Sequence, residues 1–212
     1  MRFAFEFCVA LAPELWLSLM SMEMAKPDTL KPAPFREWVR VKFLYPYLKS
    51  IPTHERTLDL ACGYGFSFKI NPNFYGIELD QVACAFNQSL GRKVKQGSLL
   101  EPYPFEDGFF DNVFSHDVLE HFALDQVPII FKNAHRVLKR GGTFLNIVPN
   151  KKGYQFGIDI NAGHVHFVDE SEIKRVAEET GFRLEKVYTC PLPLFLHEAF
   201  THNKLVTVCI KL

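Results

Sequence analysis

The sequence predicts an α/β protein with a doubly wound, Rossmann-like sheet of seven strands, mostly parallel, with the last strand antiparallel. Three observations predict this class. From Thr57 onward, short apolar segments alternate with longer amphipathic ones, as in successive βαβ units. The first apolar segment ends in a glycine-rich turn, "LDLACGYG" (58–65). A chain of 212 residues, 48% of them hydrophobic, is long enough to bury the core of one such domain.

The strands are predicted from short apolar or alternating segments that lie between turn residues. In chain order, the expected strands are 57–61, 73–79, 92–97, 110–116, 143–149, 183–190 and 204–211. The segment 191–203, between the last two strands, has no strong helical pattern. A connection without a helix favours an antiparallel final strand, because parallel neighbours need a crossover.

The helices are predicted from the spacing of apolar residues and from the residues at their ends. In order, they are expected at 65–70, 80–90, 125–139 and 169–181. Asp80 can cap the second helix, and Asp169 with Glu172 resembles a capping box at the start of the fourth. Gly141 and Gly142 are expected to end the third helix.

The chain divides by composition into two parts. Residues 1–35 are apolar and then interrupted by prolines, which predicts an N-terminal extension that serves as a lid. The domain is expected to span 36–212 and to begin with a helix at 36–49. The loop 150–168 contains aromatic and apolar residues, and it is the second expected part of the lid over a partly apolar pocket.

Charge and cysteine content exclude several classes of protein. Lys plus Arg and Asp plus Glu both number 24, so the chain lacks the positive field that nucleic-acid binding needs. The five cysteines are odd in number and show no CxxC spacing, which indicates reduced thiols and a cytoplasmic protein. No apolar segment reaches the length of a membrane-spanning helix.

The glycine-rich turn carries the first functional signal. Gly63 and Gly65 allow a ligand to approach the backbone, but Phe68 stands where a dinucleotide fingerprint has its third glycine. Glu78, at the end of the second strand, can accept hydrogen bonds from both hydroxyls of a ribose. These residues favour a ligand that contains a nucleoside and no pyrophosphate. Asp59 as a helix cap and Glu78 as a solvated strand end are the structural alternatives.

At this point the sequence resembles the class I S-adenosylmethionine-dependent methyltransferases, and most closely their small-molecule, type 11 branch. The resemblance covers about residues 55–212. It rests on the order and spacing of "LDLACGYG", "YGIELD", "QGSLLEPYPFEDGFFDNVFSHDVLEHF", "AHRVLKRGGTFLNIVPN" and "HVHFVDESEIKRVAEETGF". The implied cofactor is S-adenosylmethionine, with S-adenosylhomocysteine as its product, and the implied partner is a small-molecule methyl acceptor.

The resemblance also implies which residues bind the cofactor. Asp59 and the turn would surround the methionine part, Glu78 would hold the ribose, and Leu79 would lie beside the adenine. Ser98 departs from the family, which often has an aspartate there for the adenine amino group. The full implied set is Asp59, Ala61, Cys62, Gly63, Tyr64, Gly65, Glu78, Leu79, Ser98, Leu99, Ser115 and His116.

Histidines that follow the fourth and fifth strands are the candidates for acceptor chemistry. A general base is needed only if the acceptor must lose a proton, and His121 and His164 are the expected catalytic residues. A structural role suits the same histidines. Glu120, His121 and His166 form an alternative metal-ligand set, because some related RNA-methylating enzymes use a similar pattern. Asp117 replaces the first glutamate of that pattern, and the expectation is that no metal is bound.

Two other functions remain open. A regulatory or partner subunit would bind the cofactor without catalysis, and the glycine turn and Glu78 would be compatible with that function. A nicotinamide-dependent oxidoreductase would use the same fold, but Phe68 opposes it. Binding and turnover of S-adenosylmethionine would separate the three functions. The sequence contains no Asn-Pro-Pro-Tyr motif after the fourth strand, which argues against methylation of nucleic-acid bases.

Overall fold

The computed structural model describes residues 48–49, 51–149, 164–189 and 204–212. The expected N-terminal extension at 1–35 lies outside the described residues, as do most of the helix expected at 36–49 and most of the loop 150–168. The connection 191–203 is also outside them.

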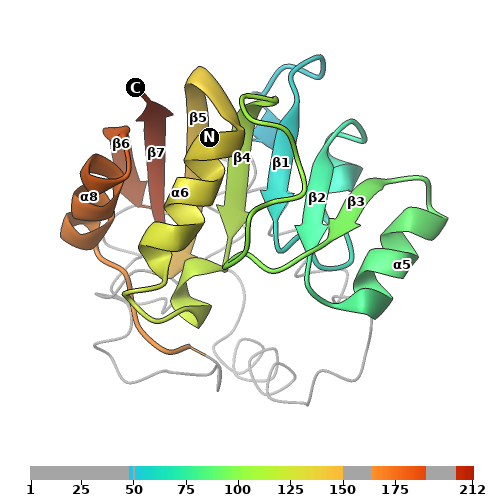
Figure 1. The fold of residues 1–212 in the computed structure, drawn as a ribbon, viewed down its shortest axis with the longest axis horizontal. Coiled ribbons are helices and arrows are strands. Elements are labelled where there is room, and N and C mark those ends of the chain that lie inside the picture. The colour runs from blue at the N-terminus through green and yellow to red at the C-terminus, as the bar shows by residue number, and fades with distance from the viewer. Residues whose placement is uncertain (1–47, 50, 150–163, 190–203) are drawn as a thin grey trace, which may run out of the picture. The chain divides into compact units, whose positions relative to one another are not determined.

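Seven strands form one sheet in the order β3-β2-β1-β4-β5-β7-β6 (Figure 1). Neighbouring strands from β3 to β5 pair in parallel, and β7 pairs antiparallel with both β5 and β6. This confirms the predicted sheet and its antiparallel last strand. The strands are β1 (Thr57–Leu60), β2 (Tyr75–Glu78), β3 (Lys93–Gln96), β4 (Phe110–His116), β5 (Leu138–Pro149), β6 (Phe182–Thr189) and β7 (Lys204–Lys211).

Helices lie on both faces of this sheet. They are α5 (Gln81–Ser89), α6 (Val127–Val137) and α8 (Glu170–Glu179), with short 3-10 helices η3 (Ser67–Lys69) and η4 (Leu119–His121). Asp80 accepts from the Ala83 N–H at the start of α5, and Asp169 and Glu172 complete a capping box at α8. Both predicted caps are therefore confirmed.

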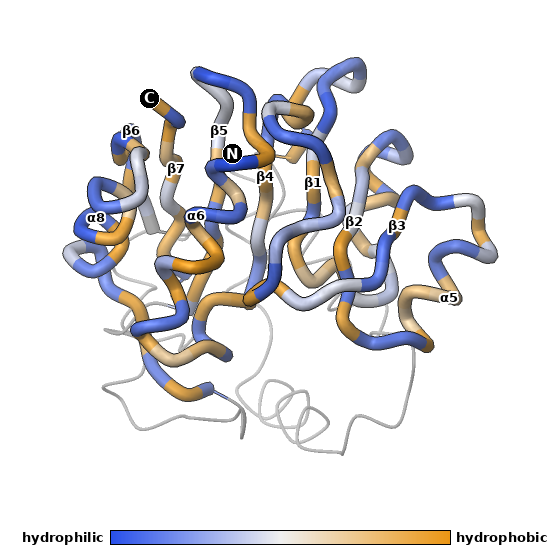
Figure 2. Tube along the Cα trace, in the orientation of Figure 1, coloured by the Kyte–Doolittle hydropathy of each residue, from blue (hydrophilic) through white to orange (hydrophobic). Residues whose placement is uncertain are grey.

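The alternation of side chains along β4 and β5 explains why helices cover both faces. Val113 and Phe144 point into the core under α6 and α8, whereas their neighbours Phe114 and Leu145 point into a second core that includes Cys84 of α5. Parallel strands are usually covered on both faces of the sheet, so this burial is expected. Figure 2 shows apolar residues along the strands and hydrophilic residues in most loops at the upper edge of the sheet.

The junction between α6 and β5 differs from the prediction. α6 ends at Val137, and Gly141 and Gly142 do not stop it but lie within β5. The ladder between β4 and β5 pairs Phe110 with Leu138 and resumes only at Thr143, so the glycines belong to a bulge. A Cβ on Gly142 would lie 2.9 Å from the Asp111 carbonyl oxygen, which explains why the bulge needs glycine there.

The first βα connection is also shorter and tighter than predicted. β1 ends at Leu60, one residue early, because Ala61 has a positive φ of 52° and cannot continue a strand. The helix predicted at 65–70 is the single 3-10 turn η3. The consequence is a compact turn between β1 and η3 that brings backbone groups to the carboxyl end of the sheet.

At one edge of the sheet, β3 presents lysines. Lys93 and Lys95 are exposed, and their ammonium groups lie over the rings of Tyr75 and Phe105, at 4.7 Å from each ring centroid. Lys95 also donates a hydrogen bond to the Pro104 carbonyl oxygen at 2.7 Å. These contacts hold both side chains against the sheet edge.

Candidate active site

The turn after β1 is built from residues with left-handed backbone. Gly63 and Gly65 have φ values of 53° and 76°. A Cβ on Gly65 would lie 2.1 Å from Asn87 Oδ1 and 2.5 Å from an Arg92 guanidinium nitrogen, whereas a Cβ on Gly63 would meet no atom of the described residues within 4 Å. Gly65 is therefore required by the protein's own packing, while the space beside Gly63 is open to a ligand.

Glu78 is fixed against this turn rather than left in solvent. One carboxylate oxygen accepts from the Gly63 N–H at 2.7 Å, and the other accepts from the Asp80 N–H at 2.9 Å. The side chain is buried, so it is not the solvated strand end that the alternative interpretation required. Each oxygen has a second lone pair, which leaves two acceptor positions for the hydroxyls of a ribose.

Two residues that the sequence analysis did not identify hold the turn from behind. Asn87 of α5 donates to the Gly63 carbonyl oxygen at 2.8 Å, and Arg92 donates to the Tyr64 carbonyl oxygen at 2.9 Å. Arg92 also donates to Asn87 Oδ1 at 2.8 Å. No local pattern signals such contacts, because their partners are separated by 24 and 28 residues.

Asp59 is a buried carboxylate beneath the turn. Ser67 at the start of η3 donates a hydrogen bond to it, which ties β1 to the following helix. Burial raises the pKa of Asp59 to about 7, the Ser67 hydrogen bond opposes that rise, and the nearby Glu78 charge adds to it. A carboxyl group with such a pKa changes its charge near neutral pH and can respond to a cation placed beside it.

The other predicted cofactor residues fall into two groups. Leu79 is 67% exposed, and Tyr64 is exposed with its ring edge-on to Phe86, so both side chains are accessible to a ligand. Leu99 is buried in the main core, and Ser98 accepts a hydrogen bond from the Leu100 N–H within its own turn. Leu99 can therefore meet a ligand only through its backbone.

Cys62 has a structural environment. Its thiol is buried and lies where a Cβ on Gly76 would come within 2.6 Å of the sulfur. Burial, then the Asp59 and Glu78 charges, raise the pKa of this thiol far above its ordinary range. The side chain therefore stays protonated and serves packing, as expected for a cysteine that is not a nucleophile.

The carboxyl end of β4 holds a chain of polar contacts. Ser115 is fully buried and donates to Asn146 Oδ1 at 2.8 Å. His116 Nε2 lies 3.4 Å from a carboxylate oxygen of Asp117, and Lys204 of β7 forms an ion pair with the same carboxylate. Asp117 has a φ of 54°, so a non-glycine residue is held in a left-handed conformation where β4 ends.

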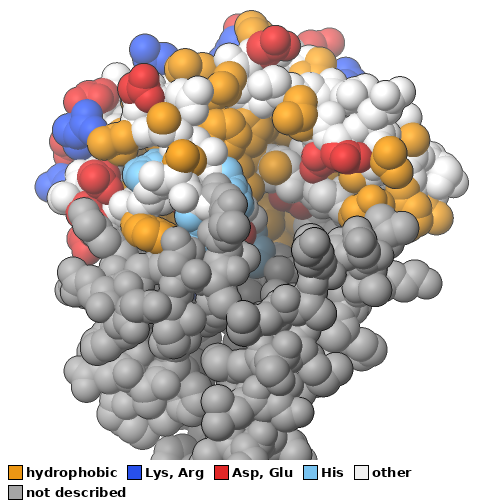
Figure 3. All heavy atoms as spheres, turned by 90° about the horizontal axis from the view of Figure 1, so that it is seen from below, with side chains coloured by type: hydrophobic (Ala, Val, Ile, Leu, Met, Phe, Trp, Pro, Cys, Tyr) orange, Lys and Arg blue, Asp and Glu red, His pale blue; other side chains and the backbone are white. Residues whose placement is uncertain are grey.

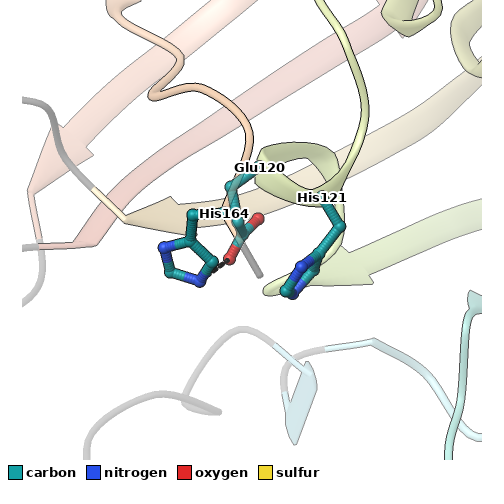
Figure 4. Close-up of side chains that lie close together, drawn as sticks. All are labelled: Glu120, His121 and His164. Carbon is teal, nitrogen blue, oxygen red and sulfur yellow. Dashed lines mark ion pairs between the residues drawn. The ribbon is translucent and has the colours of Figure 1, made fainter. Parts of the chain in front are cut away.

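Glu120, His121 and His164 lie together beyond this strand end (Figure 4). Their donor atoms all lie within 4.8 Å of one another, and His164 Nε2 is 3.9 Å from a Glu120 oxygen. Seen from below, histidine side chains lie close to apolar side chains on this face of the molecule (Figure 3). Sequence reasoning placed His166 in this set, but among the described residues it is His164 that completes the cluster.

Glu120 is the most unusual member of the cluster. It is fully buried, and neither carboxylate oxygen has a hydrogen-bond partner among the described residues. Burial, then the charge of Asp117, raises the pKa of Glu120. The adjoining segment is held in place, because the Val165 N–H donates to the Glu120 carbonyl oxygen at 2.9 Å.

This fold and turn match a known family. Residues 58–146 match the family model described as a methyltransferase domain. This match and the fold together support a class I methyltransferase. The predicted family is confirmed, and S-adenosylmethionine is the cofactor that this family uses. No curated protein matches the chain.

Solved structures support the fold of the methyltransferase. A protein from Pyrococcus horikoshii is 19% identical with a TM-score of 0.66, covering 86% of this chain and 93% of its own. An S-adenosylmethionine-dependent methyltransferase from Methanosarcina mazei is 18% identical with a TM-score of 0.63, covering 79% and 98%. A putative methyltransferase from Haloferax volcanii, solved with the Trm112 activator, is 16% identical with a TM-score of 0.62, covering 82% and 92%.

No helix in the described part of the methyltransferase is long and apolar enough to cross a membrane. Three of its cysteines, Cys62, Cys84 and Cys209, are buried free thiols.

Proposed function

We propose that this protein transfers a methyl group from S-adenosylmethionine to an oxygen, nitrogen or carbon atom of a small, partly apolar molecule. The observation that carries the proposal is the turn after β1, where Glu78 is fixed to Gly63 and the space beside Gly63 is open. This arrangement suits a nucleoside without phosphates, because Phe68 occupies the position of a dinucleotide site's third glycine and is buried in the core.

For the cofactor-binding residues we propose the roles that the family resemblance implied. We assign Glu78 to the ribose hydroxyls, exposed Leu79 to the adenine face, and Asp59 to the side of the amino-acid group. S-adenosylmethionine supplies an electrophilic methyl carbon, so the protein's task is to orient the acceptor and exclude water. The free cysteines in the described residues are consistent with a cytoplasmic protein.

On the acceptor side we assign His121 and His164. His121 belongs to η4, which follows β4, and β4 is the neighbour of β1 in the sheet. The lid at 1–35 and the start of the methyltransferase domain at residue 36 stay predictions. That the methyl acceptor is a small molecule and not a nucleic acid also stays a prediction. A subunit that binds the cofactor without catalysis is the second candidate, since the well-formed turn supports binding more directly than it supports turnover.

Calorimetric titration of the purified protein with S-adenosylhomocysteine, and in parallel with NAD, tests the proposal. Micromolar binding of S-adenosylhomocysteine without binding of NAD is the expected result. A preference for NAD would overturn it. Transfer of labelled methyl groups from S-adenosylmethionine to a panel of hydroxylated and amine-containing small molecules then separates an enzyme from a binding subunit, which would bind and show no transfer.

The pKa of Asp59 predicts that cofactor affinity depends on pH. The α-ammonium of the cofactor favours an ionised carboxylate beside it, and Asp59, with a pKa of about 7, is about one-tenth ionised at pH 6 and nine-tenths at pH 8. We therefore expect S-adenosylhomocysteine to bind up to about tenfold more tightly at pH 8 than at pH 6. Titration calorimetry at several pH values measures the slope.

Asp59→Asn is the matched variant for this dependence. The amide keeps the shape of the carboxyl group and can still accept from Ser67, but it does not titrate between pH 6 and 8. Its affinity should be nearly constant over that interval. An equal slope in both proteins would assign the dependence to another group.

A further inference from the structure

We propose that Glu120, His121 and His164 bind one divalent transition-metal ion, and that this ion binds a hydroxyl oxygen of the methyl acceptor. The first part stands on the side chains alone, while the second part rests on the proposed methyltransferase function. The three side chains come from two segments, η4 and the irregular segment before α8, and they lie close together (Figure 4).

The buried carboxylate is the first argument. Glu120 has 0% of its surface exposed and no hydrogen bond to either oxygen among the described residues. The Nε2 atom of His164 is 3.9 Å away, too far for a hydrogen bond. Buried polar groups are nearly always paired, and an ionised carboxylate without a partner is costly. A cation bound to this oxygen would supply the missing partner.

The spacing of the donor atoms is the second argument. Imidazole nitrogens and carboxylate oxygens bind zinc at about 2.0–2.2 Å, so two ligand atoms of one tetrahedral ion lie about 3.3–3.6 Å apart. The Glu120–His164 pair, at 3.9 Å, exceeds that separation by only a few tenths of an ångström. The widest separation in the cluster is at most 4.8 Å, so the ion would draw the side chains together by about one ångström, a distance that rotation of the side chains can supply.

The ligand types decide which ions fit. Two imidazoles and one carboxylate suit zinc, manganese, iron or cobalt, whereas magnesium and calcium prefer oxygen ligands alone. Three protein ligands leave at least one coordination position open, as in catalytic rather than structural sites. His121 is exposed, so the open side of the cluster is accessible from solvent.

The position of the cluster suggests what the open coordination position binds. Glu120 and His121 follow β4 closely, and ligands of open α/β sheets bind beyond the carboxyl ends of the strands. A hydroxyl oxygen bound to the ion would lose its proton to water more readily, since a divalent cation stabilises the resulting anion. In that arrangement the two imidazoles are ligands rather than general bases, and the acceptor atom is oxygen.

Metal binding is tested first, without reference to activity. The full chain is treated with a chelator, and Zn²⁺ and Mn²⁺ are titrated in by calorimetry. We expect one ion per chain with micromolar or tighter affinity, at least 30-fold weaker binding in Glu120→Gln and His164→Ala, and a change of less than threefold in His166→Ala. An equal loss in His166→Ala, or no binding in the wild type, would overturn the assignment.

S-adenosylhomocysteine affinity is measured on the same variants. Unchanged affinity shows that the variants are folded and that lost metal binding is specific. Wild-type protein that binds S-adenosylhomocysteine but no metal would overturn this inference and leave the proposed function standing. Protein that binds metal but no S-adenosylhomocysteine would confirm the cation site and overturn the assignment to a methyl acceptor.

The open coordination position has its own test. Co²⁺ is loaded into the wild-type protein, and acetohydroxamic acid, which offers two oxygen ligands, is added. We expect the visible absorption bands of Co²⁺ to shift, with saturation at one equivalent bound per ion. Bands that do not respond would show a closed coordination sphere and would overturn the role in acceptor binding.

Discussion

Gly65→Ala is expected to lower the free energy of unfolding by about 3 kcal/mol, because a left-handed alanine costs about 1–2 kcal/mol and overpacking adds about 1–3. The structural cause is the position of its Cβ, which would lie 2.1 Å from Asn87 Oδ1 and 2.5 Å from an Arg92 nitrogen. Both atoms belong to the network that supports the turn, so neither can move without breaking a hydrogen bond. Chemical denaturation of the two proteins measures the difference.

Gly63→Ala is the matched control, because Gly63 has a similar φ but, in the part of the chain that the structure describes, no neighbour within 4 Å of a Cβ added there. The expected loss of stability is only the left-handed cost of about 1–2 kcal/mol. The methyl group would instead occupy space beside the turn, so S-adenosylhomocysteine should bind at least tenfold more weakly. Equal losses of stability in the two variants would contradict the distinction between a packing glycine and a ligand glycine.

Glu78→Ala is expected to weaken S-adenosylhomocysteine binding about 100-fold. Two hydrogen bonds from ribose hydroxyls to a carboxylate are lost, each worth about 1.5–3 kcal/mol. Even the lower end of their sum, about 3 kcal/mol, corresponds to a factor of at least 100. The variant also releases the Gly63 N–H that Glu78 now fixes, which loosens the turn. Titration calorimetry measures the affinity, and thermal unfolding shows how much of the effect comes from stability.

Glu78→Gln separates charge from shape. The amide oxygen can still accept one of the two backbone hydrogen bonds. The NH₂ group is a donor and faces the other backbone N–H, which is also a donor, so the second hydrogen bond is lost. Its affinity should fall between those of the wild type and Glu78→Ala. If both variants bind S-adenosylhomocysteine within threefold of the wild type, the ribose is held elsewhere.

Local signals were enough to predict most of the fold. Apolar strands buried on both faces, the caps at Asp80 and Asp169, and the sequence pattern that indicated an antiparallel last strand all depend on short segments. The end of α6 was predicted wrongly because Gly141 and Gly142 look like a helix stop, while their function is to form a bulge opposite Asp111. A bulge exists only where β5 is paired with β4, and the residues around Gly141 and Gly142 do not show that pairing.

The candidate site was predicted less completely. Glu78 and the glycines carry a recognisable motif, but Asn87 and Arg92 support the turn through contacts with residues more than 20 positions away. Lys204 reaches Asp117 across 87 positions. For the same reason, the sequence did not reveal that His164 rather than His166 joins Glu120 and His121. That outcome depends on how the segment before α8 is held against η4. Long-range contacts of this kind are set by tertiary structure alone.

The lysines at the sheet edge have a consequence for solubility. β3 is an outer strand, and an unpaired outer strand is a template on which a second chain can add. A strand that docked on β3 would lie beside the exposed Lys93 and Lys95 and would partly dehydrate their two ammonium groups. That penalty protects the edge against self-association. Exchange of these lysines for threonines should therefore raise the tendency of the folded protein to aggregate.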